Sequence, residues 1–135
     1  MTSGKAFFDT NVLLYMLSED TKKADTAESL LALGGDISTQ VLNEFTSVAR
    51  RKMGMSFSEI REVFIPICRI CEVAPVTMDT HSEGMRIAER YGFNIWDALI
   101  VASAVLVDCA VLYTEDLHHK QVVDGRLQII NPFSS

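Results

Sequence analysis

The chain has 135 residues, of which 48% are hydrophobic and 22% are charged. This length suits one domain covering residues 1–135, and the composition excludes both a disordered chain and a small disulfide-dependent scaffold. Eighteen acidic residues against twelve basic ones give a net charge of −6, which is unusual for a protein that binds nucleic acid along a basic surface.

Two further features of the sequence bear on location. No apolar run approaches the roughly 18 residues of a membrane-spanning helix, and the first residues lack the regions of a secretory signal. The odd number of cysteines, three, is simplest to explain as reduced thiols. We therefore expect a cytoplasmic protein that has no membrane partner.

Short apolar runs alternate with amphipathic stretches along the whole chain. In chain order the pattern predicts a strand at 6–8, helices at 11–17 and 21–33, a strand at 36–38, a helix at 39–53, a helix from Ser56 that contains Pro66, a strand at 72–76, helices at 79–91 and 95–107, and strands at 110–113 and 127–130. Thr21 and Asn94 are expected helix caps, and Ser56 with Glu59 has the spacing of a capping box. This alternation predicts an α/β sandwich with a mainly parallel sheet.

Two acidic residues follow predicted strands directly. Asp9 comes after Ala6-Phe7-Phe8, and Asp116 lies just beyond the strand that ends at Tyr113. In open α/β sheets, ligands bind beyond the carboxyl ends of the strands, so these two carboxylates are candidates for one site. Each has a simpler interpretation as well, because Asp9 could cap the next helix and Asp116 could belong to a solvated turn.

Two further acids lie on predicted helices. Asp97 is the one charged residue of an otherwise apolar helix, where an unpaired carboxylate is costly. It could be a metal ligand, or it could accept from the helix N-terminus as a capping-box acid. Glu44 lies at the edge of its helix's apolar arc and could equally be an ordinary boundary residue. Converging carboxylates without paired histidine or cysteine suit Mg²⁺ or Mn²⁺. Such an ion can activate water and neutralise the charge of an in-line phosphoryl displacement, which is the chemistry of a nuclease.

Four segments resemble a known family when they are taken together. They are Phe7-Phe8-Asp9-Thr10-Asn11-Val12-Leu13-Leu14-Tyr15, the helix that carries Glu44, Ile95-Trp96-Asp97-Ala98-Leu99-Ile100, and Leu112-Tyr113-Thr114-Glu115-Asp116-Leu117. In this order and spacing they resemble the PIN-domain nucleases, in particular the VapC toxins of bacterial toxin–antitoxin pairs. The resemblance covers nearly the whole chain.

The resemblance implies a three-layer α/β/α sandwich around a parallel sheet, often in a homodimer, and endoribonuclease activity with Mg²⁺ or Mn²⁺. It also implies a cognate VapB-like antitoxin as partner. The family's acidic positions fall on Asp9, Glu44, Asp97 and Asp116, with Asp9, Asp97 and Asp116 as metal ligands. Asn11, Thr114 and Glu115 are supporting polar groups, and either Glu115 or Asp116 could be the outer ligand. Lys120 stands where many relatives have glycine.

The basic residues cluster most densely at Arg50, Arg51 and Lys52. We predict that they contact the RNA backbone, although they could instead compensate the dipole at a helix C-terminus. Three other functions compete. A ribonuclease could use His81, His118 and His119 as acid and base, the fold could serve as a non-catalytic binding module, or the nuclease could process RNA without being a toxin. An aspartyl phosphatase or a receiver domain would explain neither Glu44 nor Asp97.

Overall fold

The computed structural model describes residues 5–134. In chain order this part folds into β1 (Ala6–Phe8), α1 (Thr10–Tyr15), α2 (Thr21–Ala32), β2 (Gly35–Ser38), α3 (Thr39–Met53), α4 (Phe57–Ile70), β3 (Cys71–Ala74), α5 (Met78–Tyr91), α6 (Ile95–Leu106), β4 (Val111–Tyr113), β5 (Val122–Val123) and β6 (Leu127–Ile130). None of these helices is long and apolar enough to cross a membrane.

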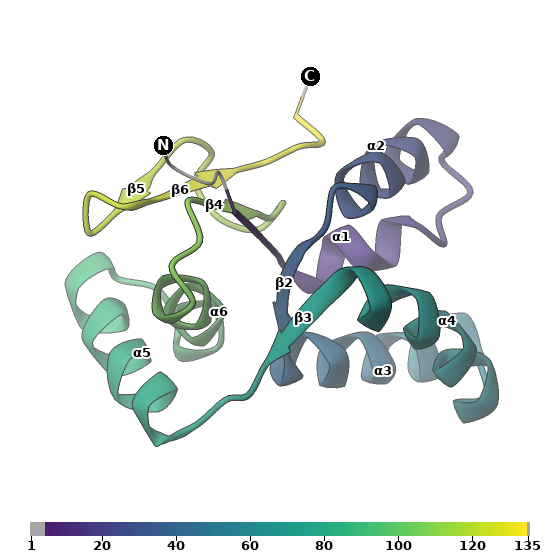
Figure 1. The fold of residues 1–135 in the computed structure, drawn as a ribbon, viewed down its shortest axis with the longest axis horizontal. Helices are drawn as coiled ribbons and strands as arrows, with labels where there is room; N and C mark the ends of the chain where they lie inside the picture. The colour runs from purple at the N-terminus through teal and green to yellow at the C-terminus, as the bar shows by residue number, and fades with distance from the viewer. Residues whose placement is uncertain (1–4, 135) are drawn as a thin grey trace.

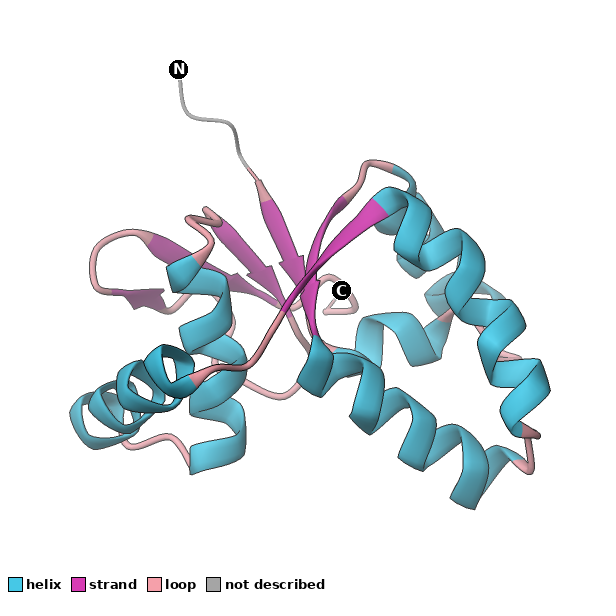
Figure 2. Cartoon of the chain, turned by 60° about the horizontal axis from the view of Figure 1, so that its bottom comes forward, coloured by secondary structure: helices cyan, strands magenta, loops and turns pink. Residues whose placement is uncertain are grey.

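The six strands form one sheet in the order β3-β2-β1-β4-β6-β5. All neighbours are parallel except β5 and β6, which pair antiparallel at one edge. Helices α5 and α6 cover one face of the sheet and α1 to α4 the other, as Figures 1 and 2 show from two directions. The predicted three-layer sandwich with a mainly parallel sheet is therefore confirmed.

Apolar side chains of the central strands and of α6 fill the core. Phe7 and Phe8 of β1 are completely buried, as expected for a strand with helices on both faces. Every residue of α6 from Ala98 to Val105 is buried. The first turn of this helix is less buried although the helix is mostly apolar in sequence, because Trp96 is 65% exposed.

Most predicted helix ends are confirmed, with one correction at α2. The capping box of Ser56 and Glu59 forms with both of its hydrogen bonds, and the Asn94 side chain caps α6. Thr21 does not cap α2, because Asp20 takes that position and accepts from the backbone N–H of Lys23. Strand β5 is absent from the sequence prediction, since two valines are too short to produce an alternating pattern.

Strand β1 lies beside β4 with Phe8 opposite Tyr113. Both strands run in the same direction, so the residues that follow them emerge at the same edge of the sheet. The backbone N–H of Asp9 donates to the carbonyl of Tyr113 at 3.0 Å. Segments about a hundred positions apart in the sequence thereby place Asp9 next to Thr114.

Candidate functional site

A pocket of about 350 Å³ opens at the carboxyl edge of the sheet. All four predicted acids line it: Asp9 after β1, Glu44 on α3, Asp97 on α6 and Asp116 after β4. Their convergence follows from topology, because β1 and β4 are neighbours while α3 and α6 begin at this edge on opposite faces. The side chains of Asn11 and Arg51 line the same pocket.

Asp9 is held by a short chain of hydrogen bonds at the base of the pocket. One carboxylate oxygen accepts from the backbone N–H of Thr10 at 2.7 Å, and the other accepts from Thr114 Oγ1 at 2.8 Å. Thr114 Oγ1 in turn accepts from the backbone N–H of Asp116 and from Asn11 Nδ2, which also donates to Asp116 Oδ2 at 3.1 Å. The predicted supporting groups Asn11 and Thr114 therefore connect two of the acids.

The charge of Asp9 is poorly solvated in the absence of a counter-ion. Burial raises the pKa of Asp9 to about 6, although its hydrogen bonds from Thr114 and Thr10 lower it and the negative charges of Asp116 and Glu44 raise it slightly further. A buried carboxylate with this pKa and other acids beside it is typical of a site that receives a cation or a proton.

Glu44 is fixed by two neighbours that the sequence analysis did not single out. Thr10 Oγ1 donates to Glu44 Oε1 at 2.7 Å, and Gln40 Nε2 donates to Glu44 Oε2 at 3.2 Å. Thr10 is itself buried. The sequence signal that could have identified Thr10 is its place directly after Asp9 at the start of a helix, where a buried hydroxyl needs a partner.

Asp97 occupies the third position of α6, and its surroundings combine the two interpretations left open by the sequence. Its backbone N–H donates to Asn94 Oδ1, and its carboxylate accepts from the Asn94 side-chain amide at 2.9 Å. The second bond uses a side chain and not the backbone N–H of a true capping box. Partial burial raises the pKa of Asp97, as do the charges of Asp116 and Glu44, while the Asn94 hydrogen bond lowers it.

The structure places Asp116 and Glu115 on different sides of their loop. Asp116 lines the pocket. Glu115 accepts from the Tyr15 hydroxyl at 2.6 Å and lies 3.6 Å from Lys23 Nζ. Its side chain is thus committed to contacts outside the pocket, while its backbone N–H donates to Asn11 Oδ1. Of the two candidates for an outer ligand, Asp116 is the one with access to the pocket.

The oxygen atoms that line the acidic pocket are of the kind that a hard divalent cation prefers as ligands. Carboxylate oxygens of four acids line the pocket, one of them buried, and oxygen is the ligand that Mg²⁺ and Mn²⁺ prefer. Within residues 5–134, however, no three acidic, histidine or cysteine side chains are already grouped closely enough to ligate one ion. Asp97 and Asp116, each held by an asparagine amide, would have to turn inward to complete such a group.

The three predicted RNA-binding residues have different surroundings. Arg51 lines the acidic pocket, with its Nε donating to Ser47 Oγ. Arg50 instead donates to the carbonyl of Met55 and lies over the ring of Phe57, which is a local role at the end of α3. Lys52 is exposed in the same last turn.

The chain matches a known protein family and shares its fold with solved structures. The family model of the PIN domain matches residues 6–125, and no curated protein matches the chain. The solved structures with similar folds include a toxin–antitoxin complex from Klebsiella pneumoniae, with a TM-score of 0.74, 19% identity and coverage of 97% of this chain and 100% of that one.

Two other solved structures have the same fold at similarly low identity. The sarcin-ricin loop cleaving toxin VapC20 of Mycobacterium tuberculosis has a TM-score of 0.65 and 20% identity, covering 83% of this chain and 90% of its own. FitAcB from Neisseria gonorrhoeae has a TM-score of 0.65 and 16% identity over 95% and 98% of the two chains. The family model spans most of the chain, so the protein belongs to the PIN domain family.

Proposed function

We propose that this protein is a Mg²⁺- or Mn²⁺-dependent endoribonuclease and the toxin of a toxin–antitoxin pair. The observation that carries the proposal is the convergence of Asp9, Glu44, Asp97 and Asp116 on one pocket of a PIN domain. The fold similarity to toxins, including one described as cleaving the sarcin-ricin loop, favours RNA as the substrate.

The four pocket acids have two roles in the proposed reaction. Asp9, Asp97 and Asp116 would hold the ion, which supplies charge neutralisation at the phosphodiester and activation of water. Glu44, which Thr10 and Gln40 orient, would accept a proton.

The remaining pocket groups bind and orient. Arg51 brings a permanent positive charge to a site that would otherwise repel the RNA backbone. Asn11 and Thr114 hold the carboxylates of Asp9 and Asp116 in position relative to each other by hydrogen bonds.

The proposed chemistry is tested by cleavage of single-stranded RNA with purified protein. EDTA should abolish cleavage, as should Asp9→Asn or Asp97→Asn, and added Mg²⁺ or Mn²⁺ should restore it only for the unmodified chain. Attack by water should leave a 5′-phosphate and a 3′-hydroxyl. Products that carry a 2′,3′-cyclic phosphate would instead support the histidine mechanism of His81, His118 and His119 and would overturn the metal-dependent one.

The biological role requires a separate test. Expression of the protein alone should arrest growth, and co-expression of a VapB-like antitoxin from a neighbouring reading frame should restore it. Asp97→Asn serves as the control, since it removes a proposed ligand that is only partly buried. Growth arrest that persists in this variant would separate toxicity from nuclease chemistry. Cleavage without any growth arrest would favour a PIN nuclease of RNA processing.

The homodimer that we expect is a separate proposal, and sedimentation of the purified protein tests it.

A further inference from the structure

The side chain of Trp96 is unusually exposed for its position. It lies in the first turn of α6, whose residues from Ala98 to Val105 are buried, yet 65% of it is accessible. Trp96 is also the one tryptophan of the chain. A large aromatic side chain left in water next to an acidic pocket is a candidate contact for a ligand of that pocket.

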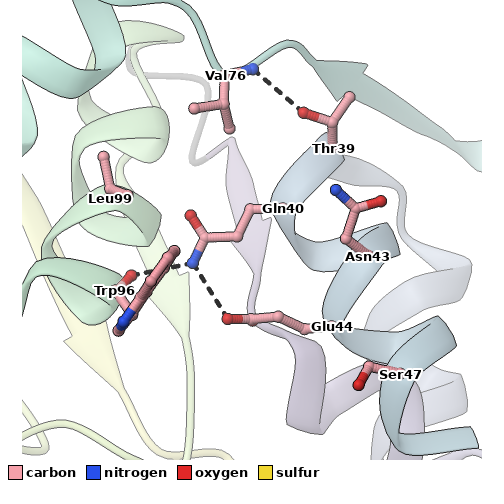
Figure 3. Close-up of a pocket in the computed structure, with 8 residues that line it drawn as sticks. All are labelled: Thr39, Gln40, Asn43, Glu44, Ser47, Val76, Trp96 and Leu99. Carbon is pink, nitrogen blue, oxygen red and sulfur yellow. Dashed lines mark hydrogen bonds between the residues drawn. The ribbon is translucent and has the colours of Figure 1, made fainter.

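Trp96 borders a second pocket of about 350 Å³ between α3 and α6. Figure 3 shows Trp96 and Leu99 on one side, the polar side chains of α3 on the other, and Val76 above them. Glu44 and Ser47 line both this pocket and the pocket of the four acids. The two spaces are therefore adjacent, and one nucleotide chain could occupy both.

Amide groups face this second pocket. Gln40 Nε2 donates to Glu44 Oε2 and to the carbonyl of Trp96 at 3.1 Å, which fixes its amide plane across the pocket. Within the described residues, neither Gln40 Oε1 nor the Asn43 amide has a hydrogen-bond partner. One acceptor and one complete amide are thus available beside an aromatic face, and amides of this kind bind the edges of nucleobases.

The charges of the second pocket disfavour a phosphate group. Among the described residues that line it there is no lysine or arginine, and its one charged side chain is Glu44. An anion would be repelled by Glu44 and would lack a counter-ion, whereas a neutral, flat ring can stack on Trp96 and contact Leu99 and Val76. The second pocket is therefore suited to a base. The acidic pocket is suited to the backbone only because Arg51 lines it and the proposed cation would offset its carboxylates.

We propose that the pocket between α3 and α6 binds an unpaired nucleobase of the RNA, which stacks on Trp96 and is contacted at its edge by Gln40 and Asn43. This inference rests on the proposed function and specifies its substrate as single-stranded RNA held by a base next to the cleaved bond. Every base has a face that can stack, so Trp96 provides affinity and the two amides provide preference among bases.

The single tryptophan allows this contact to be measured directly. RNA hexamers of each base are titrated into the Asp9→Asn variant with Mg²⁺, and an abasic ribose-phosphate hexamer of the same charge is the matched probe. The base-containing hexamers should quench Trp96 fluorescence and protect it from acrylamide, whereas the abasic hexamer should do neither. Equal quenching by both probes would overturn the proposal, because it would show backbone binding alone.

Variants of the active chain provide the second measurement. Trp96→Ala should raise KM for RNA about tenfold with a smaller effect on kcat, and Trp96→Phe should largely restore it, as expected for loss and recovery of one stacking contact. Asn43→Ala should reduce the preference among the four hexamers. Met85→Ala, an exposed apolar residue of α5 outside both pockets, is the control and should leave KM unchanged.

The outcomes separate this inference from the proposed nuclease function. Base-dependent quenching in a protein that cleaves no RNA would support the base pocket and refute the nuclease. Normal cleavage with an unchanged KM in Trp96→Ala would refute the base pocket alone. If Trp96→Ala left KM unchanged but abolished neutralisation by a co-expressed antitoxin, Trp96 would be a protein-docking residue and the proposal would be wrong.

Discussion

Individual carboxylates differ sharply in how far the sequence predicts their surroundings. Asp9 and Asp116 could be placed at one edge because each follows a strand, and the structure brings both into the same pocket. The hydrogen-bond partners of the pocket acids could not be predicted from the sequence. The bonds from Thr10 to Glu44 and from Asn11 to Asp116 join residues that are far apart in the chain. Nor does the order of Glu115 and Asp116 indicate which one turns toward Tyr15 and which toward the pocket.

The raised pKa of Asp9 predicts a distinct dependence of stability on pH. A carboxyl whose pKa rises from 3.8 to about 6 on folding binds its proton more tightly in the folded state. The free energy of unfolding in EDTA should therefore fall by about 3 kcal/mol as pH rises from about 3 to about 7, most steeply between the two pKa values, and stay low above that.

Urea denaturation of the parent and of Asp9→Asn across this range measures the contribution of Asp9. The difference between the two proteins should grow with pH and then level off. Their comparison cancels the opposite trend from Asp124, whose bond to Arg86 lowers its pKa. Parallel curves for the two proteins would contradict the prediction.

Arg50 and Arg51 are adjacent residues with different predicted effects on RNA binding. Arg51→Gln should weaken binding and reduce the slope of log affinity against log salt by about 1, because one phosphate contact is lost. Arg50→Gln is the matched control and should leave the slope unchanged, since the Arg50 guanidinium already binds Met55 O. Filter binding from roughly 50 to 300 mM salt, where counterion release is measurable, distinguishes the two variants. Equal slopes for both variants would refute the predicted phosphate contact of Arg51.

The packing of β1 against β2 depends on a glycine. A Cβ built at Gly35 would lie 2.6 Å from the carbonyl oxygen of Ala6 and 2.7 Å from Phe8 Cε2. Neither group can move freely, because both belong to the central strand of the sheet. We expect Gly35→Ala to lower the free energy of unfolding by about 2–3 kcal/mol, measured by urea denaturation.

Gly84→Ala is the comparison for that experiment. Its added Cβ would meet Leu99 Cδ2 at 2.8 Å, the end of a side chain that can shift, and alanine favours the helix. Its loss of stability should therefore be clearly smaller, and a greater loss than that of Gly35→Ala would contradict this account of the β1–β2 contact.

Elements with strong local patterns could be predicted, and elements defined by their neighbours could not. Helix α3 has both its apolar period and its terminal Gly54, and α6 has Asn94 before a long apolar run, so both agree with the prediction within a residue. Strand β5 has no such pattern and exists because it pairs with β6. Lys120, where glycine was expected from the resemblance, has a φ of 74°, the conformation that glycine favours.

Across the whole molecule, the layers and strand directions followed from the alternation of strands and helices, whereas long-range charge pairs did not. Asp36 is buried in β2, and its carboxylate lies 3.0 Å from Lys5 Nζ. The sequence predicts a strand at this position without indicating that an acid within it faces the core. The pair lies away from the acidic pocket and contributes to the sheet rather than to the site.

The four pocket acids are spread from Asp9 to Asp116, and this spacing has a consequence for biosynthesis. On the ribosome, β1 is made early but obtains its neighbour β4 only after roughly a hundred further residues, so non-local pairing makes folding slow and cooperative. A nascent chain or a proteolytic fragment that ends before Val111 contains neither Asp116 nor the strand that positions Thr114. During urea titration, RNA cleavage and the far-ultraviolet circular dichroism signal should accordingly disappear at one midpoint. Under the proposed function, partly synthesised copies would therefore not cleave RNA.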